Sequence, residues 1–199
     1  LDRGRYGLNH AGCDSMLMFS EGDGYFRGRR ECTDTRINAE MIYSRWQPWH
    51  DVAVRTWLIP CGDWHLRVHH IENQRPLETA EGGFAVMQEP ATHTQHSAEN
   101  HAIQVTARNG ASRIVALEET TPREATTVIT PPNSSIMFAE TAAIPVLKNA
   151  LPVGSHWLIT AVCASANAEI SQLAVPEVSR QGQQLRWQYQ GNSGLITLG

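Results

Sequence analysis

Hydrophobic and polar residues alternate along most of the chain, the pattern of half-buried β-strands. Between His50 and Ile59, for example, Val52, Val54 and Leu58 are set against Arg55 and Trp57. Similar segments are 14–20, 25–31, 37–46, 64–71, 81–88, 102–108, 111–117, 124–130, 135–139, 143–149, 155–163, 184–189 and 194–198. Only residues 164–173 could form a helical turn. About a dozen short strands are typical of antiparallel sandwiches and barrels, and we predict an all-β antiparallel sandwich over residues 1–199.

Turn residues punctuate this pattern. Residues 21–24 read Glu-Gly-Asp-Gly and predict a hairpin, and Asn109-Gly110 supplies the positive φ angles of a type I′ hairpin turn. Residues 89–100 are polar and lack any period, so we expect a surface loop. Pro48 cannot join a central ladder, and the chain is expected to bend there and expose side chains at a sheet rim.

The turn at residues 60–63 leaves two strand registers open. If Ile59 pairs with Trp64, then Trp57 faces Leu66 and Arg55 faces Val68. If the pairing slips by one residue, Trp57 lies opposite Arg67 and Arg55 opposite His69, which makes a cationic aromatic platform.

Composition narrows the classes of partner. The 199-residue chain carries a net charge of −4, so a nucleic-acid partner is not expected. The chain has no run of 18 apolar residues, so we predict no transmembrane helix and expect no membrane partner. The four cysteines form no CxxC motif, which favours reduced, buried thiols and therefore a cytoplasmic location.

The histidines do not form a metal motif. His65 and His69 share a strand face with Arg67, but they are about 13 Å apart at roughly 3.3 Å per residue. This pattern favours a solvated strand face, and Glu78 and Glu81 likewise favour solvated turn positions. We expect no metal and no cofactor; a metal-dependent hydrolase using His50, Asp51, His65 and His69 is the least favoured alternative. The chain also has no GxSxG, GxGxxG or P-loop motif and no complete catalytic set.

Four of the six tryptophans lie between Tyr43 and Ile71. Aromatic rings at a sheet rim stack on the apolar faces of sugars, while neighbouring Arg and His side chains bind hydroxyls or a carboxylate. The other interpretation of Trp46 and Trp49 is a pair of core tryptophans at a corner, and the sequence leaves both open.

Three segments carry a family resemblance: YSRWQPWHDVAVRTWLIPCGDWHLRVHHI from Tyr43, LETAEGGFAV from Leu77, and PPNSSIMFAETAAIPVLKNALPVGSHWL from Pro131. They resemble the C-terminal half of the bacterial domain-of-unknown-function family 2264, from about Asp14 to Trp157. The resemblance implies a β-sandwich that follows an N-terminal helical toroid, with some members assigned to hydrolysis of glucuronide-type glycosides. It also implies that the catalytic acids lie on the toroid, so this chain alone is not expected to be catalytic.

Together these observations predict an accessory sandwich domain of a carbohydrate-active enzyme that acts on uronic-acid glycans. Its expected partners are the toroid domain and carbohydrate. The predicted substrate-binding residues are Arg45, Trp46, Trp49, His50, Arg55, Trp57 and His65. There are two alternatives. The sandwich packs against the toroid through these residues without binding substrate, or it is a free-standing carbohydrate-binding module.

Overall fold

The computed structural model describes residues 17–21, 24–26, 31–81, 95–99, 101–107, 110–117, 124–129, 143–165, 170 and 172–199. This part of the chain consists of antiparallel strands, and it contains no helix long and apolar enough to cross a membrane. The strands are β1 (Leu17–Glu21), β2 (Gly24–Phe26), β3 (Glu31–Ile37), β4 (Ile42–Trp49), β5 (Val52–Cys61), β6 (Trp64–Asn73), β7 (Leu77–Glu81), β8 (Gln95–Glu99), β9 (Ala102–Ala107), β10 (Gly110–Ala116), β11 (Glu124–Ile129), β12 (Ala143–Leu151), β13 (Gly154–Ser165), β14 (Glu177–Gln181), β15 (Gln184–Tyr189) and β16 (Asn192–Thr197). The predicted all-β antiparallel sandwich is confirmed.

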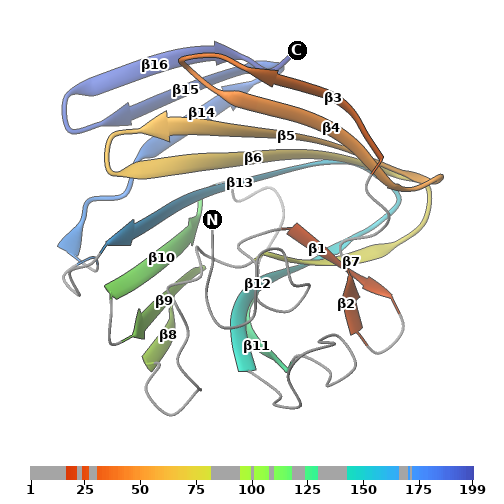
Figure 1. Cartoon of the computed structure of the whole chain (residues 1–199), viewed down its shortest axis with the longest axis horizontal. Coiled ribbons are helices and arrows are strands. Elements are labelled where there is room, and N and C mark those ends of the chain that lie inside the picture. Colours follow the sequence, from red (N-terminus) through yellow and green to blue (C-terminus); the bar gives the residue numbers. More distant parts are fainter. Residues whose placement is uncertain are drawn as a thin grey trace.

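An eight-stranded sheet forms the middle of the molecule, in the order β3-β4-β5-β6-β13-β10-β9-β8 (Figure 1). Its longest members, β5, β6 and β13, lie side by side at its centre. β6 is buried at eight of its ten positions, because most of its length is covered on both faces.

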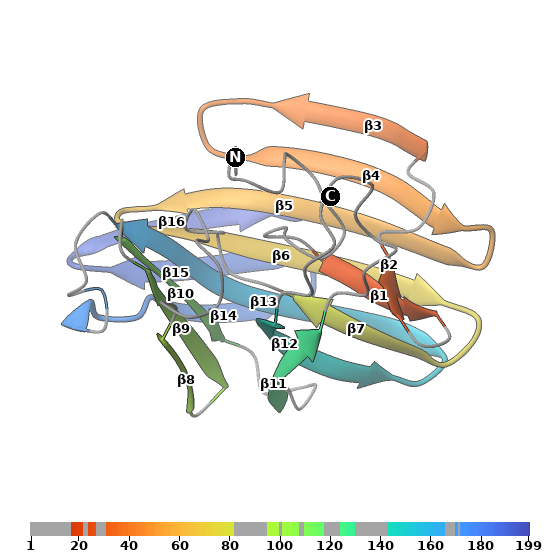
Figure 2. The ribbon, with the colours of Figure 1, turned by 60° about the horizontal axis from the view of Figure 1, so that its bottom comes forward.

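A five-stranded sheet, in the order β11-β12-β7-β1-β2, covers one face of the large sheet (Figures 1 and 2). The chain passes between the two sheets at one end of their strands, where β6 leads into β7 and β12 leads into β13. The core between them includes Phe19 of β1, Val54 of β5 and Leu158 of β13.

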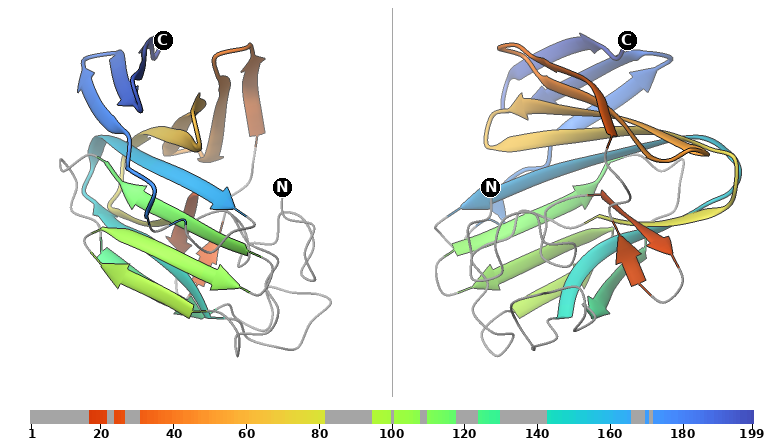
Figure 3. Two further views of the ribbon diagram at one scale, coloured as in Figure 1. Left: turned by 90° about the vertical axis from the view of Figure 1, so that its left-hand side faces the viewer. Right: turned by 45° about the vertical axis from the view of Figure 1, so that its right-hand side comes forward.

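A three-stranded sheet, β14-β15-β16, covers part of the opposite face (Figures 1 and 3). Its inward side chains Leu185, Tyr189 and Ile196 pack on Trp57 and Trp64 of the large sheet. Both of these indoles are at most 1% exposed, so this second core holds the largest fully buried side chains.

The strand faces of β6 follow the predicted alternation, but the predicted solvation is wrong. Trp64, Leu66 and Val68 point into the core under the three-stranded sheet, as expected. Arg67 and His69 point the other way and are only 5% and 4% exposed, because the five-stranded sheet covers them. Sequence alternation indicates two faces but does not show which of them a second sheet will cover.

The register at the turn differs from both predicted alternatives. Cys61 pairs with Trp64 and Ile59 with Leu66, so the connection has only two residues, with Gly62 at φ 62°. Trp57 therefore lies opposite Val68, and Arg55 opposite His70. The glycine permits the tighter turn, which shifts the pairing by two residues from the first alternative.

The other turn predictions have mixed outcomes. The hairpins β1–β2 and β9–β10 are confirmed. In the second, Ala107 pairs with Gly110, so the turn comes one position earlier than the predicted Asn109-Gly110. Residues 108 and 109 lie outside the described residues. The expected loop at 89–100 is wrong for Gln95–Glu99, which is β8. Pro48 coincides with a register irregularity between Trp46 and Trp49, as a missing donor requires. The strand predicted at 135–139 lies outside the described residues.

Candidate functional site

A row of polar and aromatic residues crosses four adjacent strands of the large sheet. Arg45 of β4 pairs with Arg55 of β5, Arg55 with His70 of β6, and His70 with Trp157 of β13. Directly paired residues share a face, and Arg55 shares its face with Trp57. The row therefore lies on the face that carries the three-stranded sheet, beside the core beneath that sheet.

Positive charge is concentrated in this row, although the chain as a whole is acidic. Arg45 is exposed, and the Arg55 side chain is 30% exposed. Nη2 of Arg55 lies 3.9 Å from Oε1 of Glu72, a contact at the limit of an ion pair. Directly opposed like charges destabilise an antiparallel pair, so Arg45 and Arg55 form an arrangement that an anion would stabilise.

His70 contacts two polar side chains at this surface. Its Nε2 lies 2.7 Å from Oγ of Ser155, and its Nδ1 lies 3.9 Å from Oε1 of Glu72. Burial lowers the pKa of His70 below its usual range; Glu72 raises it, whereas Arg55, Arg180 and His156 lower it further. The imidazole is therefore held in its neutral form at pH 7.

Trp157 fixes the orientation of the His70 ring. The two rings stack with centroids 4.3 Å apart and an interplanar angle of 23°. Trp57 also stacks on Trp157 at 5.7 Å, and the guanidinium of Arg180 from β14 lies 4.6 Å from the Trp157 centroid. Trp157 thus connects the buried core to the charged surface.

The structure divides the predicted site residues between different places. Arg45 and Arg55 lie together in the row. Trp57 is 1% exposed and lies in the adjacent core, so its ring is covered rather than presented to a ligand. His65 is half-buried near the start of β6, on the face opposite to the row. Burial and the Arg67 charge lower its pKa.

Trp46 and Trp49 occupy the opposite core. Trp46 is 8% exposed, and its Nε1 donates to Oγ1 of Thr56 at 3.2 Å. Trp49 packs edge-on against Phe19 at 5.4 Å, with Arg75 over its ring. The exposed rim of tryptophans expected at Pro48 is therefore wrong, because the five-stranded sheet packs there.

His50 is exposed in the β4–β5 turn, where its carbonyl accepts a hydrogen bond from Gln47 Nε2 at 3.0 Å. The neighbouring Asp51 is engaged by Arg75, with Nε 2.7 Å from Oδ2. Among the described residues, no three His, Cys, Asp or Glu side chains are grouped to hold a metal.

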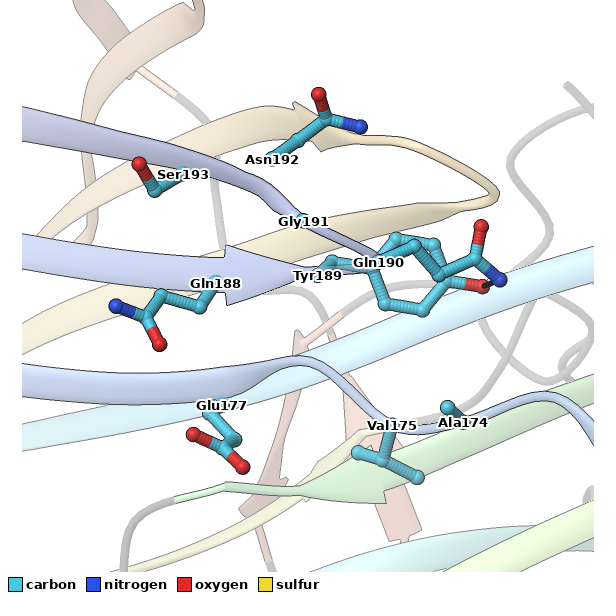
Figure 4. Close-up of a pocket in the computed structure, with 9 residues that line it drawn as sticks. All are labelled: Ala174, Val175, Glu177, Gln188, Tyr189, Gln190, Gly191, Asn192 and Ser193. Atoms are coloured by element: carbon cyan, nitrogen blue, oxygen red, sulfur yellow. Dashed lines mark hydrogen bonds between the residues drawn. The ribbon is translucent and has the colours of Figure 1, made fainter.

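A polar cavity of about 440 Å³ lies elsewhere, on the small sheet (Figure 4). Glu177 of β14, Gln188 of β15 and Ser193 of β16 line it, together with the turn at Gln190 and Gly191. Glu177, Gln188 and Ser193 form one cross-strand row. This cavity contains neither paired cations nor a histidine, so it is chemically distinct from the Arg45–Trp157 row.

Sequence reasoning missed His70, Glu72, Ser155, Trp157 and Arg180. His70 and Ser155 are 85 positions apart and meet only because β6 pairs with β13. No local sequence motif indicates a pair of residues so far apart. The sequence predicted only that His70 shares a strand face with Trp64.

Comparisons with known proteins agree with this architecture. The chain is similar to the solved structure of the heparan sulfate lyase HepC from Pedobacter heparinus, with a TM-score of 0.57 and 10% identity over 94% of this chain. It is also similar to a heparinase III structure, with a TM-score of 0.62 and 7% identity over 92% of this chain. The aligned regions are 30% and 29% of those chains, so this chain spans less than a third of their length.

At such low identities these similarities establish the fold alone. Among curated proteins, none matches the sequence significantly. The sequence does match the family described as the DUF2264 C-terminal domain, over residues 1–190. Because that match covers nearly the whole chain, the protein belongs to the DUF2264 C-terminal domain family.

Proposed function

We propose that this chain is the β-sandwich domain of a carbohydrate-active enzyme that acts on glycans containing uronic acid. In this proposal, the surface formed by Arg45 and Arg55 binds a carboxylate of the glycan and forms one wall of the substrate cleft. The catalytic cleft itself would be completed by a helical toroid domain, the partner expected from the family.

The direct pairing of Arg45 with Arg55 is the observation that carries this proposal. Guanidinium groups bind carboxylates through two parallel hydrogen bonds, and two of them side by side match an anionic repeat unit. Asp34, the residue opposite Arg45 on β3, is engaged by Arg36 at 2.7 Å. The carboxylate directly opposite Arg45 in the strand register is therefore already paired with another arginine.

The comparisons support the same class of ligand. One of the similar structures is a heparan sulfate lyase, and heparan sulfate is an acidic glycan. Apolar surface suited to a neighbouring domain is also present, because Ile37 and Ile42 form a cross-strand pair at the β3–β4 turn and are 74% and 43% exposed.

Binding of the chain to heparan sulfate and to a neutral glucan, measured by titration at several salt concentrations, tests the proposal. Arg45→Ala and Arg55→Ala should each weaken heparan sulfate binding about tenfold or more, since a hydrogen bond to a charged group contributes roughly 1.5–3 kcal/mol. Arg45→Lys should recover only part of the affinity, because an ammonium lacks the planar fork.

Arg186→Ala is the matched control. Arg186 is exposed on β15, on the outer face of the small sheet, and its loss changes the net charge equally. An equal loss of affinity in Arg186→Ala would show non-specific attraction and refute the site. Equal binding of the neutral glucan would refute the ligand class.

A further inference from the structure

Ser155 and Glu72 lie next to His70, a member of the Arg45–Trp157 row, on the same face of the large sheet. Ser155 lies directly opposite Glu72 across the β13–β6 ladder, and His70 precedes Glu72 by two positions on the same face. Oγ of Ser155 is 2.7 Å from Nε2 of His70, and Oε1 of Glu72 is 3.9 Å from Nδ1. The hydroxyl and the imidazole are therefore within hydrogen-bond distance, and the carboxylate lies within 4 Å of the second ring nitrogen, which is buried and has no hydrogen-bond partner among the described residues.

From this order we infer that Ser155 is a nucleophile, His70 its general base and Glu72 a positioning residue, and that the three hydrolyse carboxylic esters. The substrate class is an O-acyl ester on a hydroxyl of an acidic glycan; the glycan part of this assignment rests on the proposed function. Serine hydrolases on unrelated folds use the same sequence of groups, which is defined by geometry and not by chain order.

The surroundings of each residue match its role. Ser155 is exposed, so an ester can reach its Oγ. His70 is only 8% exposed and is clamped against Trp157, so the ring is held in one orientation. A proton on Nδ1, facing Glu72, leaves Nε2 free to accept the Ser155 proton. The 3.9 Å contact to Glu72 can shorten as the imidazole gains charge.

Arg55 supplies a positive charge beside these three groups. It is the cross-strand partner of His70 on β5, and its Nη2 lies 3.9 Å from Glu72 Oε1. Because β5 and β13 lie on opposite sides of β6, this charge acts on an anionic substrate as a whole and does not contact the group that reacts at Ser155. Arg45 and Arg55 share this sheet face with Ser155, three and two strands away from it, and can hold the anionic part of a glycan whose ester lies at Ser155.

The reaction balances without a cofactor. Oγ of Ser155 attacks the ester carbonyl carbon as its proton moves to Nε2 of His70, and the carbonyl electron pair moves to oxygen. The tetrahedral intermediate collapses, the C–O bond to the alcohol breaks, and His70 protonates the leaving oxygen. Water then attacks acyl-Ser155, with His70 again taking and returning the proton. The products are one carboxylic acid and one alcohol.

Hydrolysis of p-nitrophenyl acetate, together with labelling by a fluorophosphonate probe, tests the inference. We expect slow turnover and a covalent adduct that peptide mass spectrometry places on Ser155. Ser155→Ala should remove the adduct and lower kcat/KM at least a hundredfold, to the uncatalysed background. Ser155 is exposed, so this variant keeps its fold even if His70→Gln does not.

Ser179→Ala is the matched control, because Ser179 is an exposed serine on β14 paired with Arg186 and away from the row. Turnover that survives in Ser155→Ala, or an adduct on any other residue, would overturn the inference. So would the absence of both turnover and adduct in the unmodified chain.

Glu72→Gln separates positioning from a merely structural role. Since Glu72 raises the pKa of His70, the variant should move the acidic limb of the kcat/KM profile to lower pH and lower kcat with little change in KM. An unchanged profile would contradict the role of Glu72.

Acetate release from an O-acetylated uronic-acid glycan then tests the substrate class. Ester turnover without heparan sulfate binding would refute the proposed function and keep the triad. Heparan sulfate binding that persists in Ser155→Ala, without ester turnover in the unmodified chain, would refute the triad alone.

Discussion

Nη1 of Arg67 lies 3.6 Å from Oε1 of Glu81, and both side chains are buried between the two larger sheets. Burial lowers the pKa of Arg67, and Glu81 raises it again. The same Glu81 oxygen accepts a 2.6 Å hydrogen bond from Thr160 and lies 3.6 Å from Nε2 of His69. A charged network therefore occupies a position where a sandwich usually has apolar packing.

Glu81→Ala should destabilise the protein by about 3–5 kcal/mol, because it leaves the Arg67 guanidinium buried without its carboxylate. Chemical denaturation monitored by tryptophan fluorescence measures this loss. The double variant Arg67→Met/Glu81→Leu should be more stable than Glu81→Ala, because it buries no charge. A double variant as unstable as Glu81→Ala would contradict this explanation.

Gly62→Ala should destabilise the fold more than Gly182→Ala does. Both glycines have positive φ, 62° and 58°, so each substitution costs roughly 1–2 kcal/mol of backbone strain. A Cβ on Gly62 would also lie 2.7 Å from the ring of Tyr189, whereas nothing lies within 4 Å at Gly182. This overlap adds roughly 1–3 kcal/mol. Equal losses in urea titrations would show that the Tyr189 contact has no effect.

Stability should fall as the pH drops below about 6.5. The pKa values of His65 and His70 are lowered in the folded state, so the unfolded chain binds protons more readily and acid favours unfolding. The charged and titratable groups that affect the pKa of His70 are Glu72 on β6, Arg55 on β5, His156 on β13 and Arg180 on β14.

Urea midpoints compared at pH 7.5 and pH 5.5 measure this effect. The difference between them should shrink in His70→Gln, which cannot be protonated. His50→Gln, which removes an exposed histidine in a turn, is the control. If the difference in urea midpoint between the two pH values were the same in His70→Gln as in the unmodified chain, protonation of His70 would not be a cause of the acid destabilisation.

The buried thiols should be inert in the native state. Burial raises the pKa of Cys61 to about 11 and that of Cys163 to about 12, so neither forms thiolate at pH 8. In a Cys13→Ser/Cys32→Ser background, a disulfide reagent should modify both only after denaturation. Rapid modification of the native protein would contradict their burial. Because the folded pKa values are raised, the thiols favour folding at neutral pH. This contribution should be lost as the pH rises from about 9 to about 11 for Cys61 and to about 12 for Cys163.

Part of the candidate site was predictable from the sequence. Arg45 and Arg55 were predicted as carboxylate partners because guanidinium groups suit carboxylates and the family resemblance implies a uronic-acid ligand. The tryptophans themselves were misplaced: Trp46 and Trp57 are core residues, 8% and 1% exposed. An indole suits both a core and a rim, so its identity alone does not decide between them.

The sequence by itself determined the local structure, because alternation, prolines and turn glycines act over a few residues. They were sufficient for most of the antiparallel strands, although not for β3, β8 and β14, and for the two faces of β6 and the interruption at Pro48. Pairing between distant strands, and the burial of a face by a second sheet, depend on the free energy of the whole packed chain. Only the tertiary structure therefore brought Ser155 to His70, paired Arg55 with His70, and enclosed Arg67 with Glu81.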